Sequence, residues 1–151
     1  MLRGPVAAYA AADGELNLWP FIARHARIAL PVVESGQRMT FRRYRLGDPL
    51  QRNRFGIAEP RGGLPVPAIA LSVVLMPLVA FSDEGRRIGM GGGFYDRHFA
   101  AGQCPLMIGV AHEFQRLSHI SNRDWDVPLD AAVTERGWRY FTRRGRGLRV
   151  Y

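Results

Sequence analysis

Four glycines lie within five residues in the middle of the chain, between Arg87 and Asp96. They are Gly89, Gly91, Gly92 and Gly93. Glycine lets backbone N–H groups approach an anion with no side chain in the way, and a helix that starts after such a loop adds a favourable dipole. An apolar run of branched side chains precedes the loop, so the segment predicts a strand, a glycine-rich loop and a helix. That arrangement can cradle phosphate.

Two charged side chains beside the loop fit the same chemistry. The Arg87 guanidinium could bind a phosphate in a bidentate way, although a surface charge is the plain alternative. Asp96 is a hard oxygen ligand where Mg²⁺ could bridge to that phosphate, although it could also cap the helix. No Lys-Ser/Thr follows the glycines, so this is not a Walker loop. Nor is it a dinucleotide fingerprint, because no acidic residue closes a second strand further on. A glycine-rich turn that binds no ligand is the alternative interpretation.

The exact order of residues in this segment is more informative than its composition. RIGMGGGFYDR at 87–97, preceded by VLMPLVAFSDEG at 74–85, closely resembles the signature of the 5-formyltetrahydrofolate cyclo-ligase (methenyltetrahydrofolate synthetase) family. PLMIGVAHEFQ at 105–115 and WDVPLDAAVTERG at 125–137 continue the family pattern in order. Upstream blocks match at 5–22, 28–33, 39–44 and 55–60. The resemblance therefore covers residues 4–137, almost the whole chain.

The resemblance implies an ATP-dependent ligase that closes 5-formyltetrahydrofolate to 5,10-methenyltetrahydrofolate and releases ADP and phosphate, with ATP and Mg²⁺ required. It implies ATP-binding residues at Arg87, Ile88, Gly89, Met90, Gly91, Gly92, Gly93, Phe94 and Tyr95. It implies contacts with the folate, which may be polyglutamylated, at Ala10, Glu15, Phe55, Met90, Gly91, Gly92, Gly93 and Phe94. It places Mg²⁺ ligands at Asp96 and Asp130. Such a reaction needs no side-chain nucleophile, and the sequence contains no Ser-His-Asp or Cys-His set.

Several of these residues also have plain structural interpretations. Asp130 could pair with Arg123 or Arg136 instead of a metal. Glu15 could be a carboxylate at a helix start. Phe55 could simply anchor a loop.

The chain departs from the family pattern in three ways. Relatives usually begin with a further helical segment whose Lys and Arg reach the ATP phosphates, whereas this chain starts at the following strand. All 21 basic residues are arginine. Phe94 stands where the family usually has Tyr, and Met90 where it often has an aromatic residue or Arg. We expect a truncated gene or a piece of a longer chain, so a weakly active or non-catalytic folate- or nucleotide-binding remnant is an alternative function.

Composition limits the other classes of function. At 151 residues the chain is one domain, and the lone Cys104 fits a reducing compartment, so we expect a cytoplasmic monomer. No stretch approaches the ~20 apolar residues of a membrane span. The net charge of +8 could indicate RNA binding, but the arginines are dispersed except in the tail, so we expect no nucleic-acid partner. We divide the chain into a domain at 1–142 and a basic tail at 143–151.

Alternating strand and helix patterns predict an α/β domain with a layered, mixed or mostly parallel sheet flanked by helices. The resemblance adds a NagB/RpiA/CoA transferase-like fold, whose sugar-phosphate isomerases and CoA transferases are rival functions that work without ATP. Strands are expected at 6–9, 27–33, 38–46, 69–81, 106–111 and 138–142, with a short extended piece around 127–133. Helices are expected at 15–26 and 94–101, and a loop at 47–68.

Overall fold

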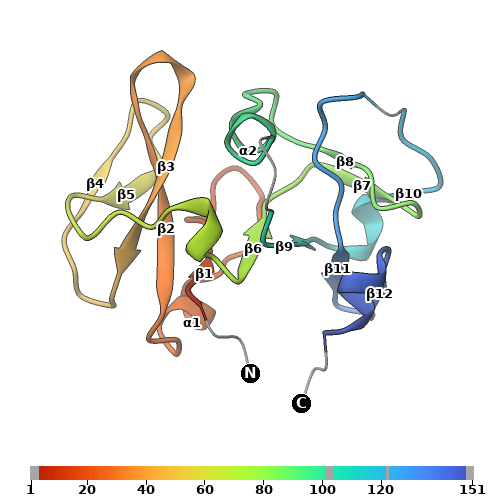
Figure 1. Cartoon of the computed structure of the whole chain (residues 1–151), viewed down its shortest axis with the longest axis horizontal. Coiled ribbons are helices and arrows are strands. Elements are labelled where there is room, and N and C mark those ends of the chain that lie inside the picture. Colours follow the sequence, from red (N-terminus) through yellow and green to blue (C-terminus); the bar gives the residue numbers. More distant parts are fainter. Residues whose placement is uncertain (1–3, 101–103, 122, 149–151) are drawn as a thin grey trace.

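A mostly parallel seven-stranded sheet forms the centre of the computed structural model, which describes residues 4–100, 104–121 and 123–148 (Figure 1). The strand order is β12-β11-β9-β6-β1-β2-β3. The five inner strands run parallel, and the edge strands β3 and β12 pair antiparallel with their neighbours. The predicted α/β class is therefore confirmed. The bounds are Val6–Ala7 (β1), Ile28–Val33 (β2), Met39–Tyr44 (β3), Val73–Met76 (β6), Leu106–Val110 (β9), Ala131–Thr134 (β11) and Gly137–Tyr140 (β12).

Two small sheets flank the central one. The segment expected as a loop at 47–68 contains a hairpin of β4 (Leu50–Arg52) and β5 (Ala58–Pro60), which turns at Gly56 with φ of 73°. The prediction of one continuous strand at 69–81 is wrong. The segment is split into β6 and β7 (Ala80–Ser82), and β7 joins a second small sheet with β8 (Arg87–Ile88) and β10 (Arg116–Leu117). Pro77 has no N–H for a ladder bond, so the sheet is interrupted after β6.

The helices are shorter than their patterns suggest. The helix expected at 15–26 is reduced to α1 (Trp19–Ile22), because the chain turns first at Gly14 with φ of 84° and only Ile22 of the helix is buried. A helix this short depends on packing rather than propensity. The others are α2 (Phe94–His98), α3 (Arg143–Arg146) and three 3₁₀ turns at Ser35–Gln37, Ala68–Ala70 and Glu113–Gln115. The C-terminal end expected for the second helix, at residue 101, lies outside the described residues. No helix among the described residues is long and apolar enough to cross a membrane.

Two apolar clusters lie on opposite faces of the sheet. Ile28 and Leu30 of β2 belong to one cluster and Ala29 to the other, as the two-residue period of a strand requires. One cluster packs around Phe41 and Phe81 and reaches α2, and the other packs against α1 and β12. Burying a side chain of this size stabilises the fold by roughly 1.5–3 kcal/mol. The two clusters fix β1 and β6 at the centre, with both faces covered.

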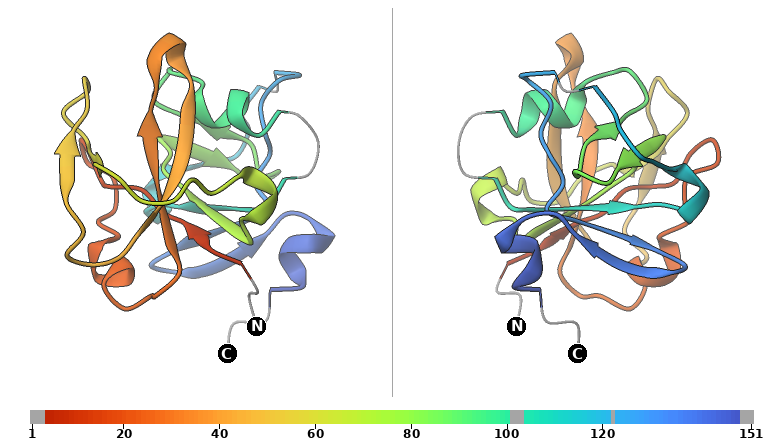
Figure 2. Two further views of the ribbon diagram at one scale, coloured as in Figure 1. Left: turned by 60° about the vertical axis from the view of Figure 1, so that its left-hand side comes forward. Right: turned by 90° about the vertical axis from the view of Figure 1, so that its right-hand side faces the viewer.

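The β2–β3 hairpin extends beyond the rest of the sheet, and its tip lies beside α2 in both side views (Figure 2). The tip is the 3₁₀ turn Ser35–Gln37, in which Gly36 and Gln37 both have positive φ, of 67° and 60°. A left-handed conformation is uncommon for a residue with a Cβ, so Gln37 is a strained position. The hairpin tip therefore lies close to the glycine-rich loop, and Arg97 donates hydrogen bonds to both.

The first part of the predicted tail is packed onto the domain. Thr142 caps α3 by accepting a hydrogen bond from the Gly145 amide at 3.0 Å. A Cβ at Gly145 would overlap the Asp130 carbonyl oxygen, so only glycine allows α3 to approach this closely. Residues 149–151 of the tail lie outside the described residues.

Gly145→Ala should therefore lower the free energy of unfolding by about 1–3 kcal/mol, because α3 must move away from the sheet. Urea unfolding followed by circular dichroism measures this change. Gly147→Ala is the matched control, since the added Cβ there meets nothing closer than 3.3 Å. Equal stability of the two variants would contradict the packing described for α3.

Candidate functional site

The glycine-rich loop joins β8 to α2 above the carboxyl end of β6, and two of its residues need glycine. Gly91 and Gly93 have φ of 92° and 65°, and Gly93 is the residue from which α2 begins. Within the part of the chain that the structure describes, the amides of Gly91, Gly92 and Gly93 donate to no protein acceptor. Consecutive unpaired backbone amides of this kind can bind an anion. The dipole expected from the helix contributes little, because α2 has only five residues.

An ion pair connects the two ends of this loop. Arg87 on β8 donates from Nη2 to Asp96 Oδ1 on α2 at 2.6 Å, and their side chains are only 6% and 17% exposed. The same oxygen accepts the Val127 amide at 3.0 Å. Arg87 Nε is buried and has no partner among the described residues. Arg87 is therefore not a surface charge, and Asp96 does not cap α2, because Gly93 occupies that position.

A second group of residues follows β1, the central strand. Tyr9 and Ala10 are buried directly after it, and the loop then turns so that Glu15 accepts the Ala12 amide through Oε2 at 2.9 Å. Burial raises the pKa of Glu15 above its usual value. The hydrogen bond from the Ala12 amide lowers this pKa, and the Asp13 charge raises it. Burial and then the Glu15 charge raise the pKa values of both Tyr9 and Tyr95. A carboxylate, two phenol groups and the Arg87–Asp96 pair thus lie in one neighbourhood.

The Tyr9 hydroxyl is buried without a hydrogen-bond partner among the described residues. Buried polar groups are seldom left unpaired, so the absence of a partner indicates a place for a water or a ligand atom. Sequence reasoning did not identify Tyr9. Its only signal is its place at the carboxyl end of a central parallel strand, where α/β folds bind ligands.

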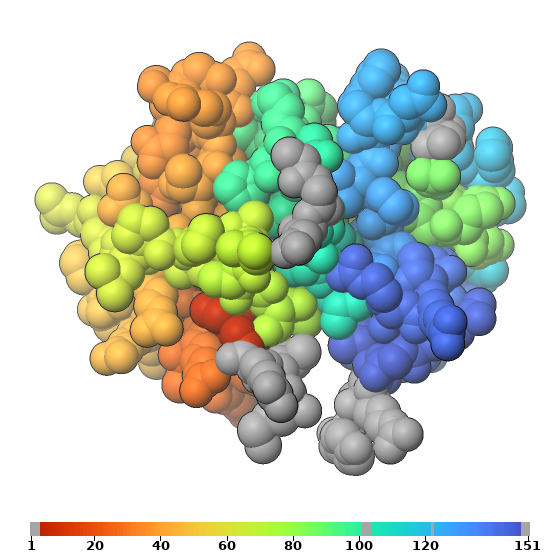
Figure 3. Space-filling view, in the orientation of Figure 1, coloured from red at the N-terminus to blue at the C-terminus, as the bar shows by residue number. Residues whose placement is uncertain are grey.

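Aromatic side chains from distant segments lie along the rim. Phe55, in the β4–β5 turn, contacts Phe94 at the start of α2 with ring centroids 5.9 Å apart in a T-shaped geometry. Phe55 and Met90 are 55% and 60% exposed. Figure 3 shows the β2–β3 hairpin, α2 and the segment after β10 side by side at the top of the molecule. Of the predicted folate residues, Phe55 and Phe94 are therefore in contact, and Met90 is exposed in the loop that leads to Phe94.

Asp130 has a different set of contacts. It lies just before β11 and accepts the Met107 amide through Oδ2 at 3.0 Å and the Thr142 hydroxyl through Oδ1 at 2.6 Å. Its ion-pair partner is Arg144, at 3.9 Å, and not Arg123 or Arg136. Both carboxylate oxygens are occupied, and the described residues contain no group of three or more His, Cys, Asp or Glu that could hold a metal. Metal binding by Asp130 stays a prediction, and the contacts themselves are structural.

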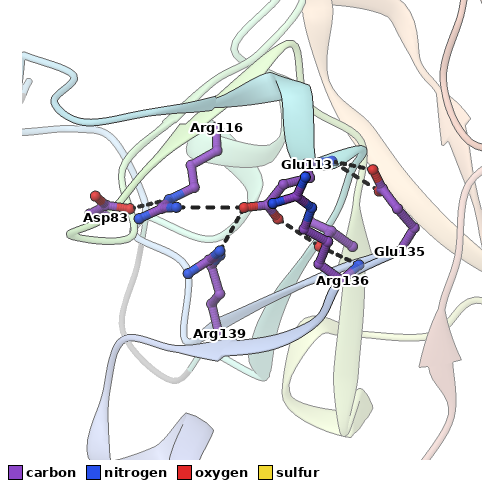
Figure 4. A network of polar contacts seen from close by, with 7 residues as sticks. Asp83, Glu113, Arg116, Glu135, Arg136 and Arg139 are labelled. Atoms are coloured by element: carbon purple, nitrogen blue, oxygen red, sulfur yellow. Dashed lines mark hydrogen bonds and ion pairs between the residues drawn. The ribbon is translucent and has the colours of Figure 1, made fainter.

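A polar network holds the small sheet that carries Arg87 (Figure 4). Glu113, after β9, accepts from Arg139 of β12 at 2.6 Å and from the Thr134 hydroxyl of β11 at 2.8 Å. These two hydrogen bonds lower the pKa of Glu113. Arg116 of β10 bridges Glu113 and Asp83, which follows β7. The network joins β7 and β10 to the main sheet and so sets where β8 lies.

Comparison with known proteins identifies the family. Residues 15–135 match the model of the 5-formyltetrahydrofolate cyclo-ligase family. The chain belongs to this family. The 5-formyltetrahydrofolate cyclo-ligase of Escherichia coli K12 is 37% identical over 139 residues, which cover 85% of this chain and 76% of the relative. That of Haemophilus influenzae is 34% identical and covers 82% of this chain and 72% of the relative.

Solved structures of cyclo-ligase relatives agree with the fold. The NMR structure of Aquifex aeolicus 5,10-methenyltetrahydrofolate synthetase is 34% identical with a TM-score of 0.80, and the match covers 98% of this chain and 76% of that one. A 5,10-methenyltetrahydrofolate synthetase from Mycoplasma pneumoniae has a TM-score of 0.63 at 24% identity, over 85% of this chain and 71% of that one. The second match supports the fold alone.

Asp130→Ala should reduce the free energy of unfolding by about 1–3 kcal/mol for each buried donor left without an acceptor. Thermal and urea unfolding measure the loss. Asp124→Ala, at an exposed carboxylate in the preceding segment, is the control and should unfold like the wild type. If Asp130→Ala kept full stability and only raised the Mg²⁺ concentration needed for activity, Asp130 would be a metal ligand and not a structural residue.

Glu15 should make stability depend on pH in a defined direction. Burial holds its folded-state pKa above the ordinary value of 4.5, so ionisation of Glu15 destabilises the fold as the pH rises through the folded pKa. Glu15→Gln should gain stability over the wild type between pH 4.5 and 7, and the gain should vanish at lower pH. Urea unfolding at several pH values tests this.

Glu84→Gln is a control of opposite sign, because the Ser82 hydroxyl lowers the pKa of Glu84. That variant should be no more stable than the wild type at neutral pH. A Glu15→Gln difference that stays constant across the pH range would contradict the desolvation of Glu15.

Proposed function

We propose that the chain catalyses the ATP- and Mg²⁺-dependent cyclisation of 5-formyltetrahydrofolate to 5,10-methenyltetrahydrofolate, with release of ADP and phosphate. The observation that carries the proposal is the loop at 89–93, whose glycine amides at 91–93 have no acceptor among the described residues and which lies in a chain of the cyclo-ligase family. Unpaired amides of this kind suit the phosphates of a nucleotide. The folate substrate is inferred from membership of the cyclo-ligase family.

The proposed reaction needs groups that position the reactants and requires no side-chain nucleophile. An N-formyl amide is a poor electrophile, so its oxygen must be converted into a leaving group. Transfer of the γ-phosphoryl group to that oxygen gives an activated imidate, N10 attacks the formyl carbon, and phosphate departs. Alignment and charge neutralisation dominate such a phosphoryl transfer.

Each part of the site has a task in this scheme. The amides of Gly91 to Gly93 would hold the transferring end of the triphosphate. Tyr95, in the first turn of α2, would lie next to these amides. Glu15 would accept hydrogen bonds from the donor groups of the pterin. A bound pterin would also meet Phe55 and Phe94, whose rings could pack on its flat face.

Asp96 fits a role at the metal better than Asp130 does. Its two protein contacts both use Oδ1, and it lies in the first turn after the loop. Asp96 would hold Mg²⁺, which would neutralise charge on the β- and γ-phosphates. Asp96→Ala would also leave Arg87 as a buried unpaired charge, so this substitution would lower both turnover and stability.

The test is an ultraviolet absorbance assay for methenyltetrahydrofolate, with ATP and Mg²⁺ present together or omitted singly. We expect product only when both are present, and one ADP released for each methenyltetrahydrofolate formed. Folate or nucleotide binding without turnover would favour the non-catalytic alternative. Product formation without ATP would contradict the proposed reaction.

A further inference from the structure

Arg97 lies directly on the glycine-rich loop. It is exposed on α2, and its Nη2 donates to the Gly92 carbonyl at 2.6 Å and to the Gln37 carbonyl at 2.9 Å. Its guanidinium carbon lies 5.2 Å from the centroid of the Phe94 ring. A Cβ added at Gly93 would be only 2.9 Å from Arg97 Nη1. The guanidinium is therefore packed against Gly92 and Gly93, two of the three loop residues whose amides are unpaired among the described residues.

No carboxylate among the described residues pairs with Arg97. Over the described residues its polar partners are two carbonyl oxygens, which are neutral acceptors. Arg87 differs, because Asp96 pairs with it at 2.6 Å and its side chain is 6% exposed. Of the arginines at 87 and 97 that flank the loop, only Arg97 combines exposure with a charge that no acidic side chain compensates.

The donors of Arg97 are also only partly used. Both hydrogen bonds to carbonyls come from Nη2, whereas Nη1 and Nε have no acceptor among the described residues. A guanidinium carries five N–H donors in a rigid fork that matches phosphate oxygens in pairs. Nη2 can therefore keep the contact with the loop and the hairpin while Nη1 binds an anion beside Gly93.

The β2–β3 hairpin tip holds this arrangement in place. Gln37 presents its carbonyl to Arg97 from a left-handed conformation, with φ of 60°, that a residue with a side chain seldom adopts. Strain of this kind persists only where the surrounding structure requires it, and it gathers at functional sites. The contact joins two segments 60 residues apart in sequence and positions the guanidinium against the loop.

We propose that Arg97 is the cationic contact for the terminal phosphates of the polyphosphate ligand held by the glycine-rich loop, with Nη2 bracing the loop and Nη1 contacting the anion. This inference rests on the proposed function, because it requires a triphosphate at the loop. It moves the cation role from Arg87, where the sequence pattern placed it, to Arg97. Arg87 then acts as a positioning residue that holds α2 through Asp96.

The experiment compares two variants that separate charge from hydrogen bonding. Arg97→Gln retains a donor for the carbonyls and loses the charge, whereas Arg97→Lys retains the charge and loses the fork. Calorimetric titrations with ATP, inorganic tripolyphosphate and adenosine give the affinity of each variant. Arg61→Gln, at an exposed arginine after β5, controls for the loss of one positive charge. Melting temperatures show whether each variant is folded.

We expect Arg97→Gln to bind ATP and tripolyphosphate roughly 10- to 100-fold more weakly than the wild type, since a hydrogen bond to a charged group is lost. Arg97→Lys should bind both polyphosphates more tightly than Arg97→Gln but less tightly than the wild type, because it keeps the charge and loses the fork. Adenosine binding should not change in either variant. Equal affinity of Arg97→Gln and Arg61→Gln for both polyphosphates would overturn the inference and leave the proposed function intact.

Two other outcomes would also be decisive. If both Arg97 variants lost ATP, tripolyphosphate and adenosine binding alike with a lower melting temperature, Arg97 would be a structural brace only, and the inference would be overturned. A wild-type protein that bound neither ATP nor tripolyphosphate would overturn the proposed function, and this inference with it.

Discussion

The ion pair between Arg87 and Asp96 is the contact on which the candidate site depends. The two residues stand at the two ends of the glycine-rich loop, so their 2.6 Å contact closes the loop and joins β8 to α2. Because both side chains are mostly buried, removing one partner would leave an uncompensated charge, at a cost of about 3–5 kcal/mol. The Val127 amide adds a third segment to the same oxygen. The loop can then leave its own amides unpaired, since its ends are held by other contacts.

Two further sets of contacts place this closed loop over the central sheet. On one side, the network around Glu113 fixes the small sheet that carries Arg87. On the other, the β2–β3 hairpin reaches Arg97 through the Gln37 carbonyl. The residues after β1, including Glu15 and the buried Tyr9, lie in the neighbourhood of Tyr95. The site is thus formed by loops that follow parallel strands, which is where α/β sheets commonly bind ligands.

Local patterns predicted strands better than helices or residue roles. Alternation and apolar runs located β2, β3 and β9 closely, because each strand buries side chains in a regular period. The helix expected at 15–26 was wrong over most of its length, since the chain turns at Gly14 before α1, and Ala23 and Ala26 after it are exposed. Asp130 shows the same limit for a site residue. Its type suits a metal, yet the Met107 amide of β9 and the Thr142 hydroxyl at the start of α3 occupy its two oxygens.

The sequence of the glycine-rich segment and of the blocks around it was sufficient to indicate the family, the α/β class and the segment that forms the loop. These properties are local, since they depend on backbone freedom, on residue order and on periodicity. Tertiary structure alone decided which charges are paired. It buried Arg87 against Asp96 and left Arg97 exposed beside Gly92, because the two arginines occupy faces of the fold that their spacing in the chain does not reveal.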